Sequence, residues 1–110
     1  METDMILSET VLSILMIGVT HYVDIGKDAD AAIYYADAET AYMRLAPDGP
    51  VMTGDWRLQD GGYFVAWRDG PQAQWYVDAD AGRFTYLDAD RQPRGTVTRF
   101  VPGDPEHLSE

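Results

Sequence analysis

Few side chains in this 110-residue chain are suited to acid–base or nucleophilic chemistry. It has no cysteine, which excludes thiol nucleophiles, thiolate metal sites and disulfides. Of its two histidines, His107 lies close to the C-terminus, while His21 falls on the apolar side of an alternating segment, where a histidine is usually a structural residue. A catalytic His21 would need an orienting carboxylate, and Asp24 and Asp28 are its candidates in the sequence.

Patterns for other chemistry are incomplete. No Gly-x-Ser-x-Gly nucleophile motif occurs, and the Asp-Gly-Gly run at 60–62 lacks the Lys and the Ser or Thr of a phosphate loop. Two Asp-x-Asp segments begin at Asp78 and Asp88, but the twelfth position of a calcium loop would be Ala89 or Arg99 instead of a carboxylate. The sequence therefore predicts no catalytic residue, no metal site and no cofactor.

Aromatic side chains are the remaining feature with a functional interpretation. One interpretation is that the rings fill the core of a small protein. Another is a pocket for an apolar or planar ligand, and its expected residues are Trp56, Tyr63, Trp67, Trp75 and His21. A third is an aromatic patch that docks a protein partner.

The stretch that holds the tryptophans predicts a β-hairpin with a loop at 68–70. This loop would pair Tyr63 with Trp75 and Val65 with Ala73. A shift by one residue would reverse every side chain of one strand, so burial favours the register that gathers the apolar residues. In that register one face carries Tyr63, Val65, Trp67, Ala73, Trp75 and Val77.

Two glycines near this hairpin have expected conformational roles. Gly70 is expected to supply the left-handed residue that three-residue hairpin loops use. Gly54 lies within a strand pattern, where glycine indicates a bulge or a bend. Because of that expected bulge, the sequence does not assign Trp56 to a face.

Residues 8–17 predict the only helix. Ser8 can cap the first turn, and Leu7 and Leu12 have the spacing of a hydrophobic staple. Gly18 is placed to end the helix in a left-handed conformation. Because apolar residues surround its axis, we expect it to be buried on most sides while it covers an end or a face of a sheet.

Short strand patterns recur with turn residues between them from 19 to 101. The predicted fold is mainly β: an antiparallel meander that forms a small barrel or a strongly curved sheet, with one N-terminal helix. Residues 31–41 are alanine-rich and could instead hold a helical turn. We expect one domain over residues 1–110, with a mobile tail at 104–110.

The charge of the chain restricts its partners. It has 8 Lys and Arg against 19 Asp and Glu, a formal net charge of -11. Nucleic acids and anionic membrane surfaces are therefore not expected to bind.

The first residues lack the positive region and cleavage site of a signal peptide, which favours a cytoplasmic location. A periplasmic location would follow if a leader had been removed.

Several short motifs occur in order along the chain: a helix ending in Gly18, Tyr34-Tyr35, Asp48-Gly49, Gly54-x-Trp56, and Gly62 to Trp67. In this order the chain is similar to small uncharacterised bacterial lipocalin-like domains, which are often exported. It differs from lipocalins in that several strands precede Gly-x-Trp. The resemblance implies a β-barrel fold.

These observations favour a non-catalytic binding module for a small apolar or aromatic ligand. One alternative is a protein-interaction or assembly module, such as a homodimer, that uses the acidic surface or a sheet edge. A second alternative is a small enzyme that uses His21 together with Asp24, Asp28 or a tyrosine.

Overall fold

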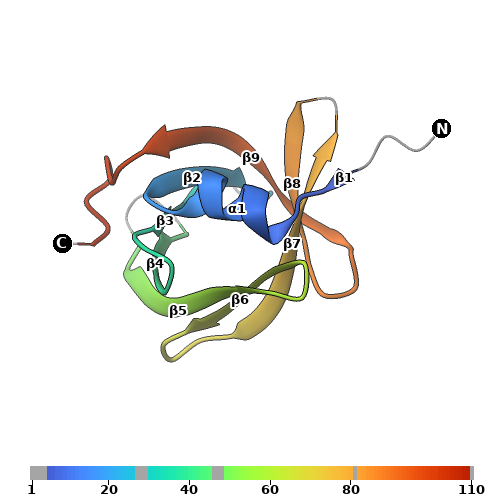
Figure 1. Cartoon of the computed structure of the whole chain (residues 1–110). Coiled ribbons are helices and arrows are strands. Elements are labelled where there is room, and N and C mark those ends of the chain that lie inside the picture. Colours follow the sequence, from blue (N-terminus) through green and yellow to red (C-terminus); the bar gives the residue numbers. More distant parts are fainter. Residues whose placement is uncertain (1–4, 27–29, 46–48, 81, 110) are drawn as a thin grey trace.

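The computed structural model describes residues 5–26, 30–45, 49–80 and 82–109. A two-residue strand, β1 (Met5–Ile6), precedes the helix α1 (Glu9–Met16), and both are labelled in Figure 1. The remaining strands are β2 (Val19–Asp24), β3 (Ala31–Tyr35), β4 (Thr40–Arg44), β5 (Val51–Gln59), β6 (Gly62–Trp67), β7 (Gln72–Asp80), β8 (Arg83–Leu87) and β9 (Pro93–Pro102).

Strands β2 to β9 form a closed antiparallel barrel in meander order (Figure 1). Each of these strands pairs with the next one along the chain, and β9 pairs back with β2. The short β1 adds to β7, beside the point where β6 begins. The predicted antiparallel fold is confirmed as a barrel. The alanine-rich segment forms strands β3 and β4, so the alternative of a helical turn there is wrong.

The hairpin of β6 and β7 has the predicted register, with Tyr63 opposite Trp75 and Val65 opposite Ala73. The conformation of its loop differs from the prediction. Asp69, with φ of 59°, takes the left-handed conformation, whereas Gly70 does not. Aspartate tolerates this region better than most residues because its short polar side chain can form local hydrogen bonds.

Gly54 introduces no bulge, which corrects the expectation for this residue. Its strand is in regular register on both sides, opposite Ala41 of β4 and Trp67 of β6. A Cβ atom on Gly54 would lie 2.6 Å from Cε3 of Trp67, so the glycine leaves room for the indole ring. With the register intact, Trp56 lies opposite Val65, faces the interior and is 3% exposed.

Helix α1 begins and ends as the sequence predicts. The side chain of Ser8 accepts a hydrogen bond from the amide of Val11 at 3.3 Å. Gly18 has φ of 76°, which lets the chain turn directly from the helix into β2. Leu7 and Leu12 are both buried in the main apolar cluster, in agreement with the predicted staple.

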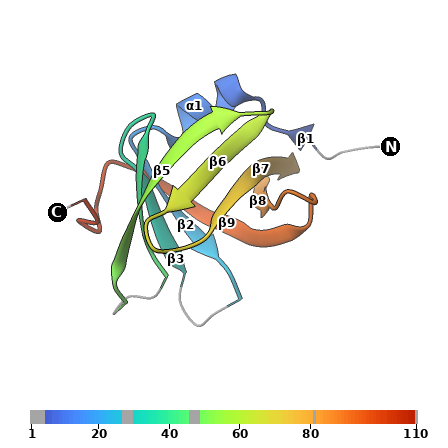
Figure 2. The same ribbon diagram turned by 90° about the horizontal axis from the view of Figure 1, so that it is seen from below.

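The expectation that α1 is buried on most sides is wrong. The helix lies across one end of the barrel (Figure 2), so only one of its sides meets the core. Leu12 and Met16 are buried on that side, while Val11 and Ile17 are exposed and Ile14 is 73% exposed. A sequence with apolar residues around the helix axis cannot by itself indicate which of them face solvent.

The C-terminal segment packs on the outside of the barrel and differs from the mobile tail predicted for residues 104–110. Leu108 is 2% exposed and completes a small apolar cluster on the outer face of β2 and β3. Glu106 accepts a hydrogen bond from the hydroxyl of Tyr22 at 2.7 Å and forms an ion pair with Arg44. These contacts anchor the described part of the segment, which ends at residue 109.

We expect Gly54→Ala to lower the free energy of unfolding by about 1–3 kcal/mol, because the added methyl group would overlap the ring of Trp67. Denaturant unfolding followed by tryptophan fluorescence measures this change. In a Trp67→Leu background the same substitution should cost less, since the ring that the methyl group meets has been removed. Equal costs in the two backgrounds would contradict this explanation.

Candidate functional site

An apolar cavity of about 280 Å³ lies inside the barrel. Residues from β2, β3, β4, β6, β7, β8 and β9, or from positions next to them, line it. Its walls are mainly aliphatic and aromatic, with Ile33, Met43, Val65 and Trp67 among them. Arg94 is the only charged side chain among the described lining residues. A concave apolar space with few polar groups is typical of small-molecule sites.

The cavity opens at the end of the barrel that α1 does not cover. Helix α1 covers the end of the barrel at which β2 begins, since the chain runs from the helix into Val19. Glu9 of the helix also accepts a hydrogen bond from the amide of Gly61, just before β6, at 2.9 Å. The lining residues Ile25 and Pro71 lie at the other end of the barrel, where Ile25 follows β2 and Pro71 precedes β7. Figure 2 shows α1 at one end, with the strands running away from it.

Three tyrosines that line the cavity form a buried hydrogen-bonded chain with His21. The hydroxyl oxygen of Tyr86 lies 2.6 Å from Nδ1 of His21 and 3.2 Å from the hydroxyl of Tyr35. The hydroxyls of Tyr35 and Tyr63 are 3.5 Å apart. At the other end of the chain, Nε2 of His21 lies 3.0 Å from the carbonyl oxygen of Leu15 in α1. The chain therefore connects the wall of the cavity to the helix that closes the barrel.

The partners of His21 determine where its proton lies. A carbonyl oxygen only accepts hydrogen bonds, so Nε2 donates to Leu15 and carries the single proton of the neutral ring. Nδ1 therefore accepts from the hydroxyl of Tyr86. Burial lowers the pKa of His21 to about 4, although the bond to Leu15 opposes this effect. His21 is thus neutral at pH 7.

Burial also controls the ionisation of the three tyrosines in this hydrogen-bonded network. It is the largest cause that raises the pKa of Tyr35, Tyr63 and Tyr86 well above the usual value for a phenol. Charge interactions among the three hydroxyls raise these pKa values as well, whereas one hydrogen bond to each hydroxyl lowers its pKa. All three groups therefore remain protonated hydrogen-bond donors over the physiological pH range.

The structure separates the five residues that the sequence predicts as ligand-binding. Tyr63, Trp67 and Trp75 line the cavity. Trp56 and His21 are buried but do not line it. The indole of Trp56 instead donates from Nε1 to a backbone carbonyl in the turn between β3 and β4, at 2.8 Å. That any of the five contacts a ligand stays a prediction.

Sequence reasoning did not place Tyr35, Tyr86 and Arg94 in the site. An alternating pattern does indicate that Ile33 and Tyr35 share one face of β3. It does not indicate which inward side chains meet across the interior. Tyr86 reaches His21 only because β9 brings β8 round to β2.

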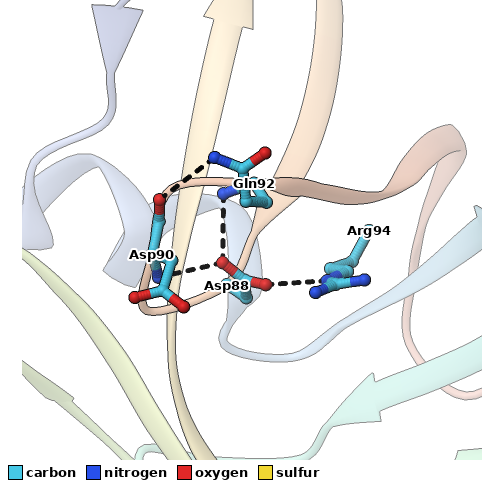
Figure 3. A network of polar contacts seen from close by, with 4 residues as sticks. All are labelled: Asp88, Asp90, Gln92 and Arg94. Atoms are coloured by element: carbon cyan, nitrogen blue, oxygen red, sulfur yellow. Dashed lines mark hydrogen bonds and ion pairs between the residues drawn. The ribbon is translucent and has the colours of Figure 1, made fainter.

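Arg94 is held at the mouth of the cavity by Asp88 (Figure 3). One carboxylate oxygen of Asp88 accepts from Nε of Arg94 at 2.7 Å, and the other accepts from the amides of Asp90 and Gln92. These hydrogen bonds, with Gln92 first, lower the pKa of Asp88. Asp88 thus organises a turn in one of the segments compared with calcium loops. Within the described residues, no group of three or more His, Cys, Asp or Glu side chains could hold a metal ion.

A second hollow of about 390 Å³ lies beside β1, β7 and β8 and shares no lining residue with the interior cavity. Asp78, Thr85 and Arg91 contribute its polar lining. One carboxylate oxygen of Asp78 is buried without a hydrogen-bond partner among the described residues.

We expect the free energy of unfolding to decrease as the pH falls from about 6.5 to about 4. Over this range the unfolded chain binds a proton at His21, whereas the folded barrel keeps the ring neutral. A difference in pKa of this size corresponds to a loss of roughly 3 kcal/mol. Denaturant titrations at a series of pH values measure this loss.

Two variants test the assignment of this pH dependence. His21→Gln should make stability less dependent on pH in this window, because glutamine does not titrate. Gln72→Asn, at an exposed position of β7 that does not titrate, should retain the dependence of the natural sequence. An unchanged slope in His21→Gln would show that other groups cause the loss of stability.

No family model, curated protein or solved structure matches this chain. Within the described residues, no helix has the length and apolar character needed to cross a membrane. The geometry of the barrel and its cavity is therefore the basis for inferring a function.

Proposed function

We propose that this protein is a non-catalytic binding module that holds a small, apolar, planar molecule inside its barrel. The observation that carries the proposal is the cavity of about 280 Å³, which opens opposite α1. Its walls include Trp67 and Trp75, and aromatic side chains of this kind suit an aromatic guest. The formal charge of -11 on the chain favours a neutral or cationic ligand over an anionic one.

The size of the cavity limits the ligand. An apolar cavity of about 150 Å³ in another protein accepts benzene. The space of about 280 Å³ is a little less than twice as large, which corresponds to two fused or linked rings. A molecule of that size would be surrounded on most sides, as ligands in protein pockets usually are.

The alternative functions have less support. Both ring nitrogens of His21 are engaged and its side chain is 2% exposed, so it has no lone pair to offer to a substrate. Each strand from β2 to β9 has a partner on both sides, which leaves little unpaired backbone for the addition of a strand from another protein. An enzyme that uses His21, or an assembly through a sheet edge, would need these arrangements to change.

We expect naphthalene to bind the cavity in a one-to-one complex and to change the fluorescence of Trp67 and Trp75, which line it. Fluorescence titration and the shift of the thermal midpoint measure this binding. Ala31→Leu should weaken it at least about tenfold, because Ala31 lines the cavity and the larger side chain would occupy part of the space.

Ala38→Leu is the matched control, since this exposed alanine lies outside the cavity, in the turn between β3 and β4. It should bind naphthalene as the natural sequence does. No binding to the natural protein, or equal loss of binding in the two variants, would overturn the proposed function.

A further inference from the structure

The hydrogen-bonded tyrosines define what a polar group on a ligand would meet inside the cavity. Tyr35, Tyr63 and Tyr86 all line it, together with Trp67 and Trp75, whose indole N–H groups are hydrogen-bond donors, and with Arg94 at the mouth. Among these side chains, only the three phenols carry hydroxyl groups, which can both donate and accept. Their donor and acceptor capacity depends on where their protons are directed.

The direction of each hydrogen bond follows from the carbonyl of Leu15. His21 donates from Nε2 to this carbonyl, so its Nδ1 accepts the proton of Tyr86 at 2.6 Å. The oxygen of Tyr86 then accepts the proton of Tyr35 at 3.2 Å. The contact between Tyr35 and Tyr63 can be a hydrogen bond only if Tyr63 donates.

Tyr63 is thus the last donor in this series, and its hydroxyl also interacts with that of Tyr86. Its distance of 3.5 Å to Tyr35 is at the outer limit for a hydrogen bond between hydroxyls. Turning its proton toward a ligand would leave the bonds of Tyr86 to His21 and of Tyr35 to Tyr86 intact, and its own oxygen retains lone pairs that can accept. Tyr35 and Tyr86 can offer only lone pairs, because their protons are used within the chain.

We propose, on the basis of the proposed function, that the ligand is a neutral two-ring molecule with one hydroxyl group. The ligand enters the cavity with this hydroxyl leading, and the hydroxyl exchanges hydrogen bonds with Tyr63. A hydroxyl can donate to a tyrosine oxygen and accept from Tyr63, so it matches both capacities of the site. A carboxylate would only accept, and it would place a charge among three neutral phenols with no cation beside them. Its nearest cation in the lining, Arg94, lies at the mouth and is already paired with Asp88.

The test compares four ligands of similar size by calorimetric titration of the natural protein: naphthalene, 2-naphthol, 2-methoxynaphthalene and 2-naphthoate. We expect 2-naphthol to bind about threefold to tenfold more tightly than naphthalene or 2-methoxynaphthalene, the factor that a well-placed hydrogen bond contributes. We expect 2-naphthoate to bind at least about tenfold more weakly than 2-naphthol. Binding of 2-methoxynaphthalene as tight as that of 2-naphthol would overturn the requirement for a donor. Tighter binding of 2-naphthoate would indicate a ligand whose head group faces Arg94 and would also overturn the proposal.

Variants of the tyrosines test the role of Tyr63. In Tyr63→Phe the ratio of the affinities for 2-naphthol and naphthalene should fall to about one. Tyr42→Phe should keep the ratio of the natural protein, because Tyr42 packs in the outer cluster near the C-terminal segment. An unchanged ratio in Tyr63→Phe would overturn the assignment. If Tyr63→Phe does not fold, the comparison of 2-naphthol with 2-methoxynaphthalene in the natural protein decides the proposal.

The outcomes also separate this inference from the proposed function. If naphthalene binds but 2-naphthol gains nothing, the barrel is a binding module without the hydroxyl preference. If none of the four ligands binds, the proposed function itself fails.

Discussion

The pairing of β2 with β9 is the contact on which the rest of the structure depends. It joins the first and last strands of the meander, which are far apart in the sequence, and its closure costs chain entropy that backbone hydrogen bonds and apolar burial must offset. An open sheet with the same strands would have two exposed edges and no inside. Once the barrel is closed, the inward side chains of all eight strands share one interior.

That shared interior explains how a polar residue such as His21 is tolerated in the core. A buried imidazole without partners would be costly, but here the two ring nitrogens are satisfied from different directions. Tyr86 approaches from β8, on the far side of β9 from β2, and Leu15 approaches from the helix at the end of the barrel. Because each of the three tyrosine hydroxyls in this network has a partner, the network supports a single arrangement of the core and of α1.

The two ends of the barrel differ because α1 covers only one of them. Helix α1 inserts Leu12 and Met16 at one end and fills it, whereas no element fills the other end among the described residues. An apolar space lined mainly by aliphatic and aromatic side chains remains at that end.

The sequence by itself determined the antiparallel strands, the ends of α1 and the register of Tyr63 with Trp75, because alternation, capping and turn residues act over a few positions. It also supplied three of the residues that line the cavity. Only the tertiary structure decided that Gly54 accommodates a ring instead of a bulge and that the C-terminal segment is anchored. It likewise decided that Trp56 lies outside the cavity lining while Tyr86 belongs to it. The place of Tyr86 depends on the pairing of β9 with β2, and a local pattern carries no information about contacts between strands that are distant in the sequence.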